Sequence, residues 1–136
     1  MILADTSAWV ELDRATESAV DLRLNELIER EAPLAVTEPI VMEVAVGARD
    51  DRRERALRDL LSRFTLLCFD SAADFDGAVR IYRRCRAAGV TPRGLLDCMI
   101  ASVAQRHDAT LLAHDSDLAR IANVIGLALD AASLRA

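Results

Sequence analysis

The chain has 136 residues, of which 52% are hydrophobic but only 4% aromatic, and it carries a formal net charge of −5. This length fits one domain, so we expect residues 1–136 to form a single unit with a core of Leu, Val, Ile and Ala. The acidic balance argues against a protein that coats nucleic acid without regard to sequence. It does not exclude a nuclease, because a metal-binding cluster itself contributes several acidic residues.

Cysteine spacing and hydropathy exclude further classes of protein. Cys68, Cys85 and Cys98 are odd in number and lack C-x-x-C spacing, which argues against a disulfide framework and against a zinc site. We expect small buried thiols in a reducing, cytoplasmic environment. No apolar run approaches the ~18 residues of a membrane-spanning helix, and no basic leader precedes an apolar stretch at the N-terminus. We therefore expect no membrane association.

Apolar periodicity in the first half of the chain predicts strands that alternate with helices. Ser and Thr residues stand where helix N-caps are expected, and a proline in a first helical turn is tolerated. In chain order the predicted elements are a strand at 2–5, a helix at 6–13 capped by Thr6-Ser7, a helix at 17–29, a strand at 34–36, a helix at 38–47 capped by Thr37, and a charged helix at 50–63.

The second half continues the alternation. Its predicted elements are a strand at 66–69, a helix at 71–88 opened by a Ser71-x-x-Asp74 capping box, a loop at 90–94, a helix at 95–107, a strand at 110–113, a helix at 115–122, and a candidate last strand at 127–129. Such alternation predicts an α/β fold, with a parallel sheet of four or five strands covered by helices on both faces. In these folds the functional site lies at the carboxyl ends of the strands.

Acidic residues fall at that edge of the predicted sheet. Asp5 follows the first strand, and Asp115 and Asp117 follow the fourth. Asp97 stands in the first turn of its helix, and Glu43 borders the apolar stripe of another. Converging carboxylates need a positive partner, and Mg²⁺ or Mn²⁺ prefers such oxygen ligands. Two such ions about 3.5–4 Å apart can activate a water and stabilise the leaving oxygen in phosphodiester cleavage, without help from His or Cys.

Each of these acids also has an ordinary interpretation when taken alone. An Asp at a helix start is favoured by the helix dipole, and a Glu on a helix face commonly forms a surface salt bridge. His114, beside Asp115, is best interpreted as a loop or packing residue, and His107 as the last-turn residue of its helix. The joint placement of the acids, rather than any single one, predicts the site.

Arginine supplies all 17 basic residues, and two clusters stand out. The cluster in the charged helix is interleaved with acids, which is typical of a solvated, salt-bridged face; its members are Arg49, Arg52, Arg53, Arg55 and Arg58. The later cluster lacks interleaved acids and is a better candidate for RNA phosphate contacts; its members are Arg80, Arg83, Arg84 and Arg86. Arg93, four residues before Asp97, is the best placed candidate.

Four blocks of sequence resemble PIN-domain toxins of the VapBC type. These blocks are Met-Ile-Leu-Ala-Asp5-Thr6-Ser7-Ala8-Trp9, Glu38-Pro39-Ile40-Val41-Met42-Glu43, the segment from Gly89 to Asp97 and on to Ser102, and His114-Asp115-Ser116-Asp117-Leu118. They occur in order and span residues 1 to about 129. Ala4 and Leu118 depart from the family pattern, where larger aliphatic and aromatic residues are usual, but neither change removes a carboxylate.

The resemblance implies a PIN-like three-layer fold and Mg²⁺- or Mn²⁺-dependent endoribonuclease activity. It implies catalytic roles for Asp5, Glu43, Asp97 and Asp115, of which Asp5, Asp97 and Asp115 hold metal. Thr6, Ser7 and Asp117 are implied as auxiliary residues. The family also implies a homodimer and a small VapB-like antitoxin. We expect that antitoxin to pack on an apolar groove between the helices at 6–13 and 38–47 and to deliver an arginine into the acidic site.

Three alternatives stay open from the sequence. A housekeeping RNA-processing nuclease would have the same fold, and a non-catalytic interaction module would have the fold without the chemistry. A receiver-type domain phosphorylated on Asp5 would need a lysine near the acids, and the chain contains no lysine. The intact set of carboxylates favours the nuclease interpretation over the interaction module.

Overall fold

A computed structural model describes residues 1–135 and contains one parallel sheet. Its strands are β1 (Ile2–Ala4), β2 (Leu34–Val36), β3 (Thr65–Leu66) and β4 (Thr110–Leu112), in the order β3-β2-β1-β4. Leu3 of β1 lies opposite Ala35 on one side and Leu111 on the other, and all three are fully buried. The predicted parallel sheet is therefore confirmed, with four strands.

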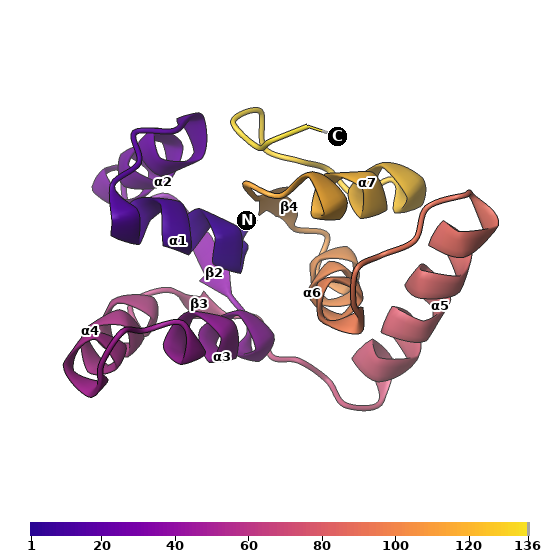
Figure 1. The fold of residues 1–136 in the computed structure, drawn as a ribbon, viewed down its shortest axis with the longest axis horizontal. Coiled ribbons are helices and arrows are strands. Elements are labelled where there is room, and N and C mark those ends of the chain that lie inside the picture. The colour runs from indigo at the N-terminus through magenta and orange to yellow at the C-terminus, as the bar shows by residue number, and fades with distance from the viewer. Residues whose placement is uncertain (136) are drawn as a thin grey trace.

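Helices cover both faces of this sheet, as predicted. They are α1 (Thr6–Arg14), α2 (Ala19–Glu29), α3 (Glu38–Val46), α4 (Asp51–Leu61), α5 (Ala73–Ala87), α6 (Leu95–Arg106) and α7 (Ser116–Ile125). Figure 1 shows α1 to α4 on one side of the strands and α5 to α7 on the other. The two layers follow from right-handed crossovers, because the chain steps one way from β1 to β3 and then returns past β1 to β4. No helix in this described part of the chain is both long and apolar enough to cross a membrane.

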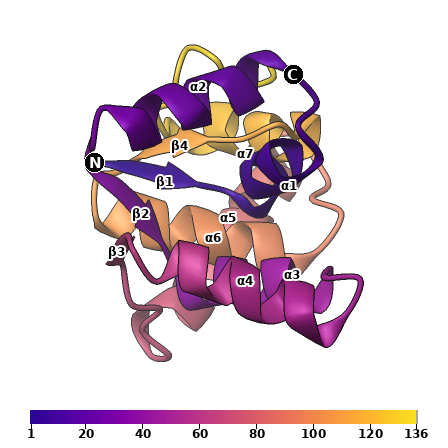
Figure 2. The same cartoon turned by 90° about the vertical axis from the view of Figure 1, so that its left-hand side faces the viewer.

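The strand order reverses between β4 and β1, and this reversal positions the site. Figure 2 shows β1 and β4 side by side, with α1 beginning where β1 ends. The backbone N–H of Asp5 donates to Leu112 O (2.9 Å) and closes the ladder at the carboxyl edge. Trp9 fixes the first turn of α1 over this edge, because its indole N–H donates to Ala4 O at 3.0 Å while its ring packs at a tilt against Phe64. A crevice at such a switch point is where open α/β sheets bind ligands.

Two predicted strands differ from the structure. The third was expected at 66–69 but spans Thr65–Leu66, because the Phe69 N–H donates to the Glu38 side chain (2.7 Å) rather than to a neighbouring strand. The candidate strand at 127–129 is reduced to a single bridge between Leu129 and Leu111. There the chain turns away at Asp130, whose carboxylate pairs with Arg23 of α2 at 3.1 Å.

Three predicted helix caps also differ. Asp5, not Thr6 or Ser7, is the N-cap of α1, and Thr37 stands at the N-cap of α3 without a capping hydrogen bond. The capping box expected at Ser71 does not form. Asp70 instead accepts from the N–H groups that open α5, while Asp74 accepts from the Asp70 N–H. A carboxylate next to a hydroxyl competes successfully for the same amides, because a charged acceptor makes the stronger hydrogen bond.

A buried polar network joins α5 to α6. Asp74 is fully buried, and it accepts hydrogen bonds from Ser102 (2.8 Å) and from the Arg106 guanidinium (2.7 Å). Gly77 lies one turn along α5, facing Ser102, and a Cβ there would lie 2.2 Å from the Ser102 hydroxyl oxygen. Glycine is therefore required at this position so that Ser102 can reach Asp74.

Candidate active site at the carboxyl ends of the strands

Asp5 uses only one of its two carboxylate oxygens to cap α1. Its Oδ2 accepts hydrogen bonds from the Ser7 backbone N–H (3.0 Å) and from the Ser7 hydroxyl (2.7 Å). The same hydroxyl oxygen accepts from the His114 N–H (2.8 Å), which ties the end of β1 to the loop after β4. The other oxygen, Asp5 Oδ1, is buried and has no hydrogen-bond partner among residues 1–135.

Asp115 repeats this arrangement at the end of β4. It is the N-cap of α7, and its Oδ1 accepts from the backbone N–H groups of Asp117 (2.8 Å) and Leu118 (3.3 Å). Its Oδ2 is not used by the cap and accepts from the Arg93 guanidinium at 2.6 Å. The two aspartates that follow neighbouring strands therefore each use one oxygen to begin a helix, and the other oxygen takes no part in the cap.

Asp97 and Glu43 come from helices on opposite sides of the sheet. Asp97 is the third residue of α6 and is largely buried, with 18% of its side chain exposed. Glu43 lies on α3, where it is half-buried and its Oε1 accepts from the Thr6 hydroxyl (2.7 Å). Thr6 thereby holds Glu43 next to the helix that Asp5 begins. The expectation that Glu43 need not point straight into water agrees with this contact.

The acids lie near enough to alter one another's ionisation. Burial raises the pKa of Asp5 to about 6 against the effect of the Ser7 hydrogen bonds, and the charges of Glu43 and Asp115 raise it further. Burial likewise raises the pKa of Asp97 to about 7, and the charges of Asp5 and Asp115 add to the effect. Such a pattern is typical of like charges held in a partly desolvated cleft. We call Asp5, Glu43, Asp97, Asp115 and Asp117 the carboxylate cluster.

Arg93 lies within the carboxylate cluster, although the sequence predicted it as an RNA contact. Its guanidinium donates to Asp115, pairs closely with Asp117, and lies 4.0 Å from Asp97. The negative charge of Asp115 is the largest influence that raises the pKa of Arg93. Asp117 also pairs with Arg120, a contact that sequence analysis missed although the i,i+3 spacing on α7 is a signal for it.

The other predicted site residues lie apart from the cluster. Arg83, Arg84 and Arg86 are exposed on α5, the outermost helix of its layer in Figure 1, and no ion pair in the described structure joins them to the cluster. His114 directs its Nε2 toward Glu11 (3.5 Å), in keeping with the predicted loop histidine.

The donor set of the cluster suits a hard divalent cation, since all its ligand atoms are carboxylate oxygens. Asp5 Oδ1 is a buried charged atom that lacks a partner, and such an atom is costly unless a cation or a donor meets it. Among residues 1–135, no three acidic, His or Cys side chains already form a complete ligand group. The chemistry of the donor atoms therefore fits a divalent cation, although the carboxylates as they stand, with Arg93 paired to Asp115, do not converge on one ion.

Comparison with known protein families matches residues 2–124 to the PIN domain. The chain is a member of the PIN-domain family. This PIN domain is 44% identical over 136 residues to the ribonuclease VapC11 of Mycobacterium tuberculosis, a match that covers 99% of this chain and 100% of the relative. The chain therefore belongs, within the family, to the VapC ribonucleases.

Solved structures show the same fold. The PIN domain aligns with VapBC2 from Rickettsia felis, bound to a promoter DNA fragment, with a TM-score of 0.76 and 19% identity over 98% of this chain and 99% of that one. It also aligns with VapC20 of Mycobacterium tuberculosis, described as a toxin that cleaves the sarcin-ricin loop, with a TM-score of 0.68 and 16% identity over 87% and 92% of the two chains. At these identities the likeness supports the fold alone.

Proposed function

We propose that this PIN domain is a divalent-metal-dependent endoribonuclease and the toxin of a toxin–antitoxin pair. Its VapC relative at 44% identity is named a ribonuclease, which supports the reaction class. The observation that carries the metal dependence is Asp5 Oδ1, a buried carboxylate oxygen without a partner inside a cluster of acids. The pKa values of Asp5 and Asp97 are raised, and Arg93 offsets only part of the repulsion among the acids.

Asp5, Asp97 and Asp115 would hold the metal, which is Mg²⁺ or Mn²⁺ in this proposal. When bound, such an ion supplies a water activated for attack and stabilises the leaving oxygen of the phosphodiester. Residues of the chain itself position the metal ligands. Ser7 fixes Asp5 by engaging Oδ2, so that Oδ1 is directed to the site, and it joins the two strand ends through the His114 amide.

Further residues extend the site beyond the metal ligands. Thr6 holds Glu43 at the side of α3, and Asp117 carries a second carboxylate on the rim beside Asp115. We assign both acids to the site as catalytic and auxiliary carboxylates, respectively. The exposed arginines of α5 supply positive charge for an approaching RNA backbone; they are Arg83, Arg84 and Arg86.

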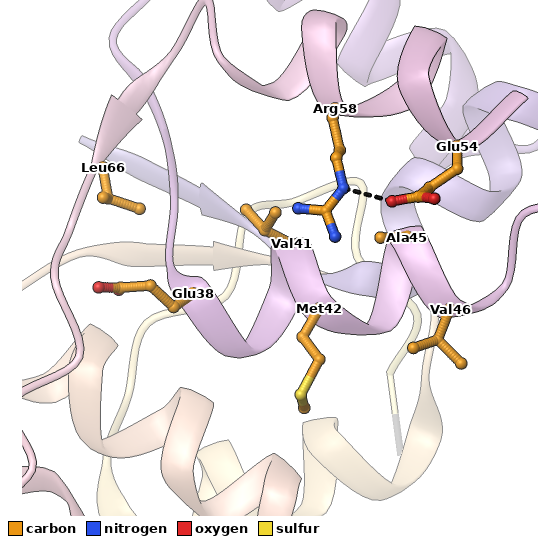
Figure 3. A pocket seen from close by; sticks show the side chains of 8 residues that line it. All are labelled: Glu38, Val41, Met42, Ala45, Val46, Glu54, Arg58 and Leu66. Carbon is orange, nitrogen blue, oxygen red and sulfur yellow. Dashed lines mark hydrogen bonds and ion pairs between the residues drawn. The ribbon is translucent and has the colours of Figure 1, made fainter. Parts of the chain in front are cut away.

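A small VapB-like antitoxin is the proposed partner, because solved structures of the same fold include VapBC complexes. A hollow between α1 and α3 is lined by the apolar residues Trp9, Val10 and Val44 together with the charged residues Asp13, Arg14 and Glu43, so a segment bound there would reach Glu43 of the carboxylate cluster. A second groove lies between α3 and α4, where Figure 3 shows Val41 and Ala45 of α3 next to the Arg58–Glu54 pair and Met42 and Val46 pointing away from that pair. We propose that the antitoxin covers these hollows and that two toxin chains associate as a homodimer.

RNA cleavage by the purified, partner-free chain tests the proposal. Cleavage should require Mg²⁺ or Mn²⁺, stop in excess EDTA, and fall by at least about 100-fold in Asp5→Asn, because the variant loses the charge of its most deeply buried ligand. Arg55→Ala, on the solvated face of α4, is the matched control and should cleave normally. Undiminished cleavage in EDTA would exclude metal dependence. A cleaving chain whose activity no small VapB-like protein inhibits in a complex would be a nuclease but not a toxin.

A further inference from the structure

Asp5 and Asp115 differ in one respect that bears on how a metal enters. In each, one oxygen caps a helix and the other takes no part in the cap. This second oxygen of Asp5 is buried and unpartnered among the described residues, whereas that of Asp115 is held by Arg93 at 2.6 Å. A divalent cation that takes both oxygens must therefore displace the guanidinium from Asp115.

Arg93 is well suited to such displacement. It belongs to the loop between α5 and α6, and 64% of its side chain is exposed, so the guanidinium can leave without disturbing the core. Exposed ion pairs contribute little stability, because water screens them and the long side chains lose entropy on pairing. Asp117 keeps a cationic partner when Arg93 departs, since Arg120 pairs with its other oxygen.

The charges around Arg93 also favour its displacement by a divalent cation. Arg93 contacts Asp115 and Asp117 and approaches Asp97 at 4.0 Å, so one guanidinium offsets part of the repulsion among three carboxylates. It does not reach the buried oxygen of Asp5, which is hydrogen-bonded to no described residue. Arg93 thus offsets part of the negative charge at the rim of the cluster, whereas the buried Asp5 Oδ1 at its base has no cationic partner among the described residues.

We propose that Arg93 is a built-in counter-ion that competes with the divalent metal for Asp115 and Asp97, and that metal binding releases its guanidinium for contact with an RNA phosphate. The inference rests on the proposed function, since it requires the carboxylate cluster to bind metal. The position of Arg93 among the acids is then compatible with a role in RNA binding, because its guanidinium pairs with the carboxylates before metal binds and with an RNA phosphate afterwards. RNA contact by Arg93 then depends on metal loading.

Calorimetric titration of the full chain with Mn²⁺ in the absence of RNA tests the competition. Arg93→Ala should bind Mn²⁺ about five- to tenfold more tightly than the unaltered chain, because a positive charge within a few ångströms of the metal and its competing ion pairs are both removed. Arg55→Ala removes the same charge from the exposed face of α4 and should change the affinity by less than about twofold, given screening by salt. Equal thermal unfolding temperatures for the metal-free variants would establish that both are folded.

A second measurement observes the guanidinium itself. In the unaltered chain, the NMR resonance of the Arg93 Nε–H should shift in proportion to Mg²⁺ occupancy as the ion pair with Asp117 opens. A resonance that stays fixed while the site fills would overturn the proposal, as would Arg93→Ala binding Mn²⁺ no more tightly than the unaltered chain. Absence of Mn²⁺ binding by either protein would instead contradict the proposed metal dependence, and the competition with it.

Discussion

Asp5 and Asp115 acquire their geometry from the same local rule. Each is the first non-strand residue able to cap a helix that starts at the carboxyl edge of the sheet, so its cap hydrogen bonds fix the side chain before any ligand is present. The sequence predicted that both acids lie at this edge, because both follow apolar runs of strand length. It did not predict the role of Arg93, because the path of the loop at residues 88–94 determines where this long side chain lies.

Protonation of the cluster should make the metal-free chain more stable at mildly acidic pH. The folded pKa values of Asp5 and Asp97, about 6 and about 7, lie above the unfolded value of 3.8, so the folded state binds protons more tightly. This stabilisation is fully present below the unfolded pKa and is lost as pH rises through 6 to 7. Thermal unfolding in EDTA should therefore occur about 3 °C or more higher at pH 5.5 than at pH 8.

Asp97→Asn is the control for this pH dependence. The variant should be more stable than the unaltered chain at pH 8 in EDTA, because one repelling charge is removed, and its stability should vary less with pH. Groups with lowered pKa values do not interfere with this comparison. The pKa of Glu26 is lowered by the hydrogen bond from Arg30, so its contribution to the stability of the folded chain is lost only as pH falls below about 4.5, outside the range from 5.5 to 8. A metal-free chain that unfolds more easily at pH 5.5 than at pH 8 would contradict the raised pKa values.

At the scale of elements, the apolar pattern predicted the helices and three of the four strands closely. The errors occurred where a side chain replaces a backbone partner. β3 ends early because Glu38 captures the Phe69 amide, and the start of α5 is set by Asp70 rather than by Ser71. Apolar periodicity indicates which face of a helix or strand is buried. It does not indicate which acceptor binds the backbone N–H groups at the end of an element.

The packing of α5 on α6 depends on glycine at position 77. Gly77→Ala should lower the free energy of unfolding by about 2 kcal/mol, because the new Cβ displaces the Ser102 hydroxyl from buried Asp74, and this loss exceeds the gain in helix propensity. Urea unfolding of Gly77→Ala, Ser102→Ala and the double variant would measure this coupling. The Gly77→Ala cost should be smaller in the Ser102→Ala background, and strictly additive costs would refute the proposed clash.

In the whole molecule, the strand order brings acids that are far apart in the sequence into one cluster. The reversal between β4 and β1 places the ends of two strands side by side, and helices from opposite faces add Asp97 and Glu43. Three elements far apart in sequence are thereby joined by Ser7 and Thr6 through short hydrogen bonds. The family relationship to VapC ribonucleases and the geometry support the same proposal: this edge of the sheet is the catalytic one.

Anomalous scattering of Mn²⁺ in crystals of the partner-free chain would locate the metal itself. We expect an anomalous peak within about 2–2.3 Å of Asp5 Oδ1, with Asp97 or Asp115 as a further ligand and Arg93 withdrawn from Asp115. Asp5→Asn crystals grown under the same conditions should lose the peak or show it at much lower occupancy. A site that stays free of Mn²⁺ at saturating concentration, or a peak that does not contact Asp5 Oδ1, would show that the carboxylate cluster is not a metal site held by Asp5.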